Sequence, residues 1–212
     1  MVKDGIPFVS FFVLAALLLS GAGWYSGGPV WWGLALLCLL LAAFMAWFFR
    51  DPERAVPTAP DLIVSPADGK VTRVESLLPG AAASPQVVSI FLSPLDVHIN
   101  RAPLAGRVTA VNYTKGRFRM ATKEDASLVN EQNAITIEGE RVTIVCKQIA
   151  GILARRIVCW SRPGDTLARG ERFGLIKFSS RTDLIMPPEV EILVQVGERV
   201  QGGVTIIGKV RP

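Results

Sequence analysis

The sequence Pro66-Ala67-Asp68-Gly69-Lys70-Val71-Thr72-Arg73-Val74 recurs as Pro103-Leu104-Ala105-Gly106-Arg107-Val108-Thr109-Ala110-Val111. Both copies fit the pattern P-x-x-G-[KR]-V-T-x-V, in which a glycine turn leads into a β-type run. A second pair of segments, 164–170 and 197–203, fits G-[DE]-x-[LV]-x-x-G, an acidic turn followed by an apolar residue and a glycine bend. These pairs indicate a β domain with two quasi-equivalent halves, although similar glycine turns recur in many β folds.

The rest of the chain beyond residue 60 also has the character of short strands. Most of these runs are rich in Val and Ile and are separated by Gly, Pro, Asp or Asn. They are Val71–Val74, Val87–Leu92, Arg107–Tyr113, Ala134–Ile137, Arg141–Gln148, Ile157–Trp160, Gly174–Phe178, Val190–Val196 and Thr205–Val210. Helical patterns are weak, with one short helix expected within Thr122–Asn130 and one turn within Ile149–Arg155. The sequence therefore favours a β-rich domain, all-β or α+β.

The paired motifs are similar to those of the biotinyl and lipoyl carrier domains. That resemblance implies a barrel-sandwich fold for the β-rich domain.

A long uncharged stretch precedes this domain. No Asp, Glu, Lys, Arg or His occurs from Ile6 to Phe49. The runs Ile6–Gly23 and Val30–Phe49 would span roughly 27 and 30 Å as helices, close to the thickness of a bilayer core. Trp24–Pro29 between them combines interfacial aromatic residues with a Gly-Gly-Pro turn. We therefore expect a membrane anchor over residues 1–54, with helices at about 6–23 and 30–49.

The flanking charges predict how this anchor is oriented. Lys3, Arg50 and Arg54 lie at the outer ends of the two runs, and the turn between them carries no positive charge. The positive-inside rule places both ends, and the β-rich domain, on the cytoplasmic side of the cell (inner) membrane. The competing interpretation is a cleaved signal peptide ending near 20–22, after which Val30–Phe49 still remains in the membrane.

Composition narrows the class of protein. Of the 212 residues, 50% are hydrophobic and 19% are charged, which excludes a disordered, collagen-like or disulfide-rich chain. The net charge of +5 suits an anionic membrane surface or an acidic substrate, and no zinc-finger or RGG pattern indicates nucleic acid. Cys38, Cys146 and Cys159 form no CxxC motif, so we expect reduced thiols in a cytosolic domain.

A small set of residues could carry chemistry. His98 is the only histidine, and alternation puts it on one face of an extended segment with Asp96 and Asn100. A serine such as Ser180 becomes a nucleophile only with a base, and His98 is the only imidazole available. Asp68 could orient the imidazole, although an Asp-Gly pair is also ordinary turn chemistry. These residues could in principle form a triad.

Taken in order, several segments resemble the phosphatidylserine decarboxylase family, in particular its short form. The segments are FFRDPER at 48–54, SPADGKV at 65–71, FLSPLDVHINRAPLAGRV at 91–108, NEQN at 130–133 and GDTLARGERFGLIKFSSRTDLIMP at 164–187. The resemblance implies a proenzyme that cleaves itself between Ser179 and Ser180 into a β chain of 1–179 and an α chain of 180–212. Ser180 would become a covalent pyruvoyl group, with Asp68 and His98 as the acid and imidazole of processing.

The resemblance further implies that residues 55–212 form a decarboxylase domain that converts phosphatidylserine into phosphatidylethanolamine and CO2, without a metal. Arg101 and Arg181 are candidate partners of the lipid phosphate, and the alternative for both is a solvated or structural role. A homodimer is also left open.

Two positions depart from the family pattern. The family usually has Gly-Ser at the scissile bond, where this chain has Ser179-Ser180, and its longer members carry two histidines near His98. His98 would therefore serve both processing and turnover, unless another group fills the second role. The alternative is a membrane-tethered carrier or adaptor of the biotinyl/lipoyl type, for which no MKM-like or DKA-like motif is visible.

Overall fold

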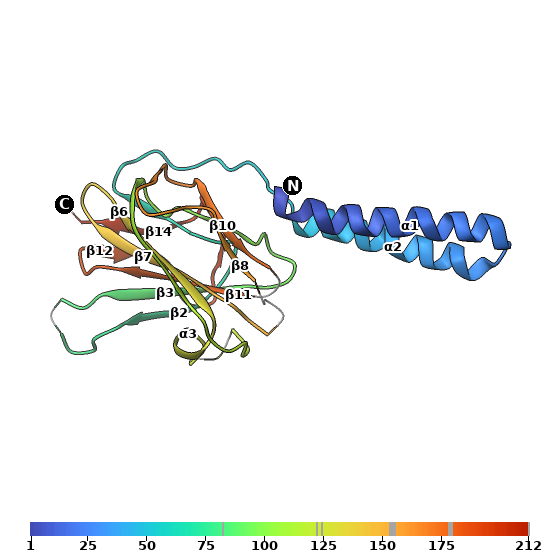
Figure 1. Ribbon diagram of the computed structural model, residues 1–212. Coiled ribbons are helices and arrows are strands. Elements are labelled where there is room, and N and C mark those ends of the chain that lie inside the picture. The colour runs from blue at the N-terminus through green and yellow to red at the C-terminus, as the bar shows by residue number, and fades with distance from the viewer. Residues whose placement is uncertain (82, 122, 124, 153–155, 178–179, 212) are drawn as a thin grey trace. The chain divides into compact units, whose positions relative to one another are not determined.

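The computed structural model describes residues 1–81, 83–121, 123, 125–152, 156–177 and 180–211. It divides into two compact units, Met1–Pro52 and Glu53–Pro212, called here the helical unit and the β unit (Figure 1). Of the two residues at the predicted scissile bond, Ser180 is described, and Ser179 lies outside the described residues.

The helical unit is an antiparallel pair of helices, α1 (Ile6–Ser26) and α2 (Pro29–Phe48), preceded by the short 3-10 helix η1 (Lys3–Gly5) (Figure 1). Gly27 ends α1 in the left-handed conformation, with φ of 69°, and its N–H donates to the carbonyl oxygen of Gly23. Pro29 then begins α2, where its missing N–H costs no hydrogen bond. The Gly-Gly-Pro sequence thus forms the turn that the sequence predicts.

Small residues allow the two helices to pack closely. Ala16 and Gly23 of α1 and Ala35 and Ala42 of α2 are buried, while most of the larger apolar side chains are exposed. Both helices are long and apolar enough to cross a membrane, by length and composition. The predicted hairpin of apolar helices is confirmed, with α1 extending to Ser26.

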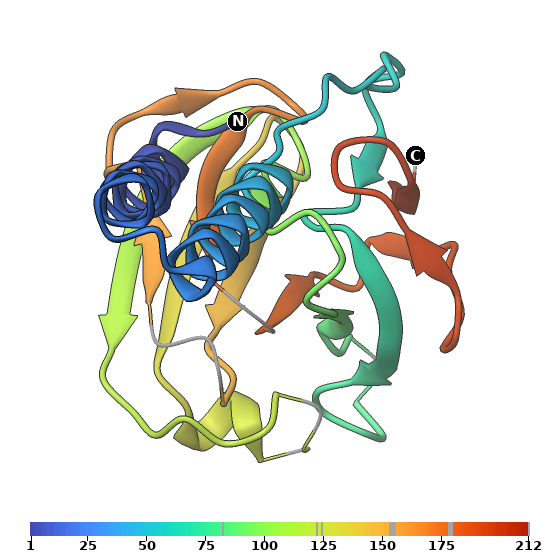
Figure 2. The ribbon, with the colours of Figure 1, turned by 90° about the vertical axis from the view of Figure 1, so that its right-hand side faces the viewer.

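The β unit consists of antiparallel strands in three sheets (Figures 1 and 2). The largest sheet has eight strands in the order β13-β2-β3-β11-β7-β6-β5-β9, and two three-stranded sheets have the orders β1-β14-β12 and β4-β10-β8. The strands are β1 (Leu62–Val64), β2 (Gly69–Ser76), β3 (Gln86–Leu92), β4 (Ile99–Arg101), β5 (Gly106–Thr114), β6 (Gln132–Glu138), β7 (Thr143–Ile149), β8 (Ile157–Cys159), β9 (Thr166–Leu167), β10 (Arg172–Ile176), β11 (Ser180–Met186), β12 (Val190–Ile192), β13 (Arg199–Val200) and β14 (Ile206–Val210). One short helix, α3 (Ala126–Val129), falls within the expected region. The β-rich fold class is confirmed, and the curled eight-stranded sheet fits the barrel-sandwich resemblance.

The paired sequence motifs occupy equivalent places in the sheet. β2 pairs with β13 in one half, and β5 pairs with β9 in the other. The N–H groups of Val71 and Val108, which are equivalent in the motif, donate to the carbonyl oxygens of Glu198 and Asp165, both at 2.8 Å. Both β2 and β5 also contain a register shift at the same motif position. The internal repeat is therefore a pseudo-two-fold relationship in space.

The two halves also exchange backbone hydrogen bonds. The N–H of Arg101 donates to the carbonyl oxygen of Pro66, and the N–H of Val64 donates to that of Pro103, both at 2.9 Å. Since Pro66 and Pro103 are equivalent in the repeat, β4 is the counterpart of β1. This equivalence allows each position of the candidate site to be compared with its counterpart in the other half.

The glycine of each P-x-x-G motif is required by close backbone packing. A Cβ atom on Gly69 would collide with the carbonyl oxygen of Phe91 in β3, and one on Gly106 would collide with that of Glu138 in β6. Each turn therefore brings its strand directly against the neighbouring strand, and a side chain at the glycine would push them apart.

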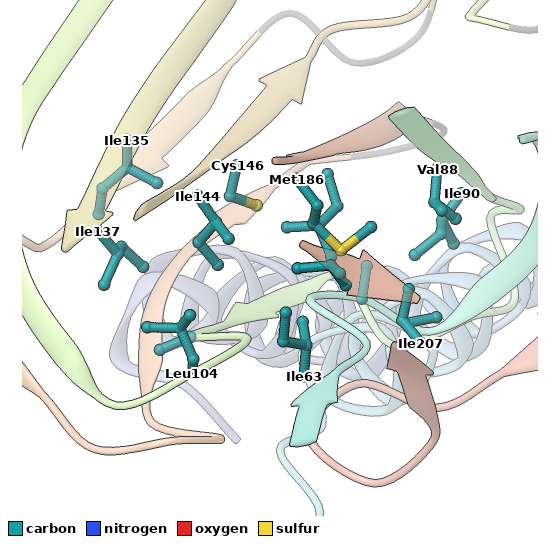
Figure 3. Packing of buried hydrophobic residues seen from close by; sticks show 14 of the residues in the cluster. Ile63, Val88, Ile90, Leu104, Ile135, Ile137, Ile144, Cys146, Met186 and Ile207 are labelled. Atoms are coloured by element: carbon teal, nitrogen blue, oxygen red, sulfur yellow. The ribbon is translucent and has the colours of Figure 1, made fainter. Parts of the chain in front are cut away.

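Apolar side chains form the interior of the β unit, and Figure 3 shows part of this cluster. The fully buried members include Ile63, Ile90, Leu92, Ile135, Ile137, Ile144, Phe173, Leu184 and Ile207. In the largest sheet these side chains alternate along the strands, so every second residue faces the interior. The inward face of this sheet positions the candidate site.

The central strand β11 lies where the sequence analysis expected no strand. Its residues Ser180–Asp183 are all polar or charged, a composition typical of a loop. In the structure β11 pairs with β3 on one side and β7 on the other, and Ser180–Asp183 are at most 3% exposed. Partners on both sides satisfy the backbone, and this tertiary pairing outweighs the local composition.

Candidate active site

Ser180 is the first residue of β11 and is fully buried. It faces Leu92 across the pairing of β11 with β3. Its Oγ has no hydrogen-bond partner among the described residues, although its exposed fraction is 0%. A buried hydroxyl without a partner costs free energy, which makes Ser180 a candidate for chemistry rather than for structural support.

His98 lies just before β4 and is 3% exposed. Its ring Nδ1 is 2.9 Å from the carbonyl oxygen of Asp96. A carbonyl oxygen only accepts, so Nδ1 carries the proton and Nε2 carries the lone pair of the neutral imidazole. This tautomer presents Nε2 as the basic atom.

The chain itself brings His98 towards Ser180. β10 runs antiparallel to β4, and the N–H of Ile176 at its end donates to the carbonyl oxygen of His98 at 3.2 Å. The next strand, β11, begins at Ser180. The short connection from β10 to β11 therefore starts beside the backbone of His98 and ends at the candidate nucleophile.

Asp68 lies in the turn before β2, with its carboxylate held from two sides. Arg54 Nη2 is 2.7 Å from Oδ2, and the N–H of Gly202 donates to Oδ1 at 2.8 Å. Burial raises the pKa of Asp68, while the Gly202 amide and the Arg54 charge oppose that rise and the charge of Asp96 adds to it. The carboxylate contacts in this structure are thus with Arg54 and Gly202, and they do not include the imidazole of His98.

Asp96 fixes the turn that leads to His98. Its Oδ2 accepts from the N–H of Ser93 at 2.8 Å, and its Oδ1 is 3.1 Å from Arg199 Nη1. Because the backbone of the same residue holds the imidazole, the side chain of Asp96 anchors the ring indirectly.

The two arginines that the sequence analysis suggested as phosphate partners are both buried. Arg181 forms a buried ion pair with Asp183 at 2.7 Å and also donates to the carbonyl oxygen of Lys123 at 3.1 Å. Arg101 donates from Nη1 to the carbonyl oxygen of Gly170 at 3.0 Å. These contacts support the structural role that was left open for both side chains.

A row of buried polar side chains, which sequence reasoning missed, lies beside Ser180. Asn133, Gln148 and Thr182 face one another across β6, β7 and β11, and Asn100 of β4 contacts this row. The signal in the sequence was an amide or hydroxyl residue two positions from an inward-facing aliphatic residue, as Thr182 is from Leu184.

The two cysteine thiols of the β unit are poor nucleophiles at neutral pH. Burial raises the pKa of both the Cys146 and the Cys159 thiols, so each stays protonated. All three cysteines are free thiols. Within the part of the chain that the structure describes, no group of three or more His, Cys, Asp and Glu side chains could hold a metal ion.

Known proteins similar to this chain define its class. The family model described as phosphatidylserine decarboxylase matches residues 41–208. A phosphatidylserine decarboxylase proenzyme of Solibacter usitatus is 46% identical over 209 residues, covering 99% of this chain and 96% of the relative. Proenzymes of the same name from Syntrophus aciditrophicus and Symbiobacterium thermophilum are 44% and 45% identical, covering 97% and 98% of this chain and 95% and 94% of the relatives.

The protein is therefore an enzyme, a carboxy-lyase, and the carrier alternative is disfavoured. The chain belongs to the phosphatidylserine decarboxylase family, and the resemblance stated from its motifs is confirmed.

Proposed function

We propose that this chain cleaves itself between Ser179 and Ser180 and then decarboxylates phosphatidylserine to phosphatidylethanolamine through a pyruvoyl group derived from Ser180. The observation that carries the proposal is the buried Ser180 Oγ without a hydrogen-bond partner, at the start of the strand that follows β10. Among the described residues this hydroxyl contributes no structural hydrogen bond, as expected of a group that is consumed in processing.

Processing begins with Ser180 Oγ attacking the carbonyl carbon of residue 179. His98 Nε2 accepts the hydroxyl proton, because the contact of Nδ1 with Asp96 leaves the lone pair on Nε2. The peptide C–N bond breaks, the nitrogen of residue 180 takes up a proton, and an ester joins the two residues. The carbonyl carbon belongs to Ser179, which lies outside the described residues.

The ester is then eliminated. Residue 180 loses its α-proton and its Oγ, which departs as part of the new carboxylate of residue 179. The dehydroalanine that remains takes up water and releases ammonia, leaving a pyruvoyl group at the start of the α chain. In sum, one water molecule enters and one ammonia molecule leaves, so the reaction needs no oxidant or reductant.

The surroundings of Ser180 fit a covalent group at this position. Ser180 is the first residue of β11, and this strand is held on both sides by pairing with β3 and β7. The pyruvoyl carbonyl supplies the electron sink for loss of the headgroup carboxylate. His98 supplies the proton that replaces the lost carboxylate on the headgroup carbon.

Asp68 is proposed to act on His98 through its charge. The ionised carboxylate favours the protonated imidazole that forms when Nε2 accepts the hydroxyl proton. The charge of Asp96 raises the pKa of Asp68, so the two carboxylates interact electrostatically. The carbonyl oxygen of Asp96 also contacts the imidazole of His98, and this shared neighbour supports a charge effect of Asp68 on His98.

The membrane part of the proposal rests on the helical unit. We propose that α1 and α2 span the inner membrane with the β unit on the cytoplasmic side, where Lys3, Arg50 and Arg54 follow the positive-inside rule. The net positive charge of the chain favours a surface that contains the anionic substrate.

The test is an intact mass of the purified full chain under denaturing conditions, together with release of CO2 from phosphatidylserine. We expect loss of the 23.0 kDa species and a C-terminal fragment of about 3.5 kDa. That fragment should be lighter by about 17 Da, the mass of ammonia, than simple hydrolysis at the same bond would give. An uncut chain without decarboxylase activity would contradict the proposal.

A further inference from the structure

The polar row in the interior of the β unit is linked by hydrogen bonds from one end to the other. Asn133 Nδ2 donates to Gln148 Oε1 at 3.0 Å, and Gln148 Nε2 donates to Asn100 Oδ1 at 2.9 Å. Asn100 Nδ2 then donates to Thr182 Oγ1 at 3.0 Å. Asn133 is 3% exposed, and the other three residues are fully buried.

This row separates two kinds of interior. In the register of the sheet, the next inward residues on one side are aliphatic or thiol, for example Leu184 opposite Cys146. The next inward residue of β11 on the other side is Ser180. The polar row is therefore the last layer of the core before the candidate nucleophile.

The row reaches the two candidate catalytic residues by the same spacing. Asn100 lies in β4 two residues after His98, which directly precedes that strand, and Thr182 is two residues from Ser180 on β11. Side chains two apart in an extended chain share a face. β10 ends at Ile176, whose N–H contacts the backbone of His98, and β11 begins at Ser180, so a short connection joins the His98 end of β4 to the Ser180 end of β11.

We propose that the Asn100–Thr182 hydrogen bond is a positioning contact that sets the approach of the His98 imidazole to Ser180. This inference rests on the proposed function. Asn100 and Thr182 act through their neighbours, and neither takes part in bond making.

The other half of the pseudo-two-fold repeat shows that the fold does not need a polar residue at this position. The counterpart of Asn100 is Ile63, which is 1% exposed and belongs to the aliphatic core. Asn100 pairs with Gly174, and Ile63 pairs equivalently with Gly208. An aliphatic side chain thus fits this site in the fold, whereas a buried amide requires every partner to be satisfied. The polar residue occurs only in the half that contains His98.

The direction of the hydrogen bonds adds an electrostatic argument. All three donors point from β6 towards β11, so the amide dipoles align with their positive ends towards Thr182. Aligned hydrogen bonds polarise one another in a low-dielectric interior. Such a field favours negative charge that develops near the start of β11.

The main test compares the rates of self-cleavage of Thr182→Val and Thr182→Ser in the full chain. Valine keeps the shape and removes the hydroxyl, and we expect cleavage to slow by about 10- to 100-fold. Serine keeps the hydroxyl and should cleave within about 3-fold of the unaltered chain. Thr136→Val is the matched control, since it makes the same change in β6 at a position outside the inward-facing set, and its rate should be unchanged.

A purely structural role predicts a different pattern. The rate of cleavage would then fall in proportion to the loss of stability, and Thr182→Ser would cleave as slowly as Thr182→Val. We therefore also measure thermal unfolding and the pH profile of cleavage, for which a positioning role predicts a lower plateau with an unchanged midpoint.

Asn100→Ile keeps the proposal testable if Thr182→Val does not fold, because it copies the counterpart residue Ile63. We expect a folded chain that cleaves about 10-fold or more slowly. Cleavage of folded Asn100→Ile or Thr182→Val at the unaltered rate would overturn the inference, as would equal slowing by Thr182→Ser. An unaltered chain that stays uncut would instead contradict the proposed function.

Discussion

Arg54 Nη2 lies 2.7 Å from Asp68 Oδ2, and both side chains are largely buried, with 12% and 16% of their surfaces exposed. Arg54 belongs to the segment that leads into the first strand, whereas Asp68 lies in the turn of the first repeat motif. The pair therefore holds the start of the β unit against the turn that carries the candidate processing acid.

Arg54→Gln should destabilise the β unit by about 1–3 kcal/mol at neutral pH, because it leaves a buried carboxylate without its cation. Burial already raises the pKa of Asp68, and removal of Arg54 takes away two of the influences that lower it. The loss of unfolding free energy should be largest at pH values where Asp68 is ionised in both the unaltered chain and the variant. It should vanish in acid, where Asp68 is protonated in both.

Urea unfolding at several pH values, in a Ser180→Ala background that keeps the chain uncut, measures this effect. Arg73→Gln is the matched control, since Arg73 is also 2.7 Å from a carboxylate, that of Glu75, but the pair is more exposed. It should cost about 0–1 kcal/mol. Equal losses for both variants would contradict the assignment of the effect to burial.

His98→Ala should leave the chain as a single uncut 23.0 kDa species, since no other imidazole is available to accept the Ser180 proton. Intact mass after prolonged incubation measures this, with thermal unfolding to show that the variant is folded. Added imidazole should restore part of the cleavage if the missing group is the base. Normal cleavage of His98→Ala would remove His98 from processing.

The two halves of the repeat show how far the sequence alone could lead. The P-x-x-G and G-[DE]-x-[LV]-x-x-G motifs predicted paired turns, and β2 with β13 and β5 with β9 occupy equivalent places. The motifs are local, so their shape follows from glycine turns and short-range alternation. Short strands such as β1 and β4 carry no comparable local signal and exist because partners distant in the chain pair with them.

The candidate site was predictable only in part, for a related reason. His98 and Ser180 stood out by residue type and family motif, whereas the contact of Asp68 with Arg54 and the polar row depend on folding. The counterparts of His98 and Asp68 in the other half are Asp61 and Ala105, so the repeat that specifies the fold does not specify the chemistry.

Gly69→Ala should destabilise the β unit by about 3–5 kcal/mol, because the new methyl group would collide with the carbonyl oxygen of Phe91. Gly164→Ala is the matched control. Gly164 also has a positive φ, 101°, but a Cβ atom there meets no other atom within 4 Å, so the cost should be about 1–2 kcal/mol. Urea unfolding of both variants in the uncut background makes the comparison. A Gly69→Ala loss no larger than that of Gly164→Ala would show that the strands can separate at this turn without cost.

The α and β chains should stay together after cleavage. β11 would begin the α chain, yet it pairs along its length with β3 and also with β7, both in the β chain. The α chain would also contribute β14, which pairs with β1. Separating the two chains would expose apolar side chains that are fully buried in the β unit, including Leu184 and Ile207 of the α chain. Native mass measurement in detergent should give the sum of both fragments, while denaturing conditions should separate them. Loss of the small fragment in native gel filtration would show that the strand pairing around β11 is rearranged by cleavage.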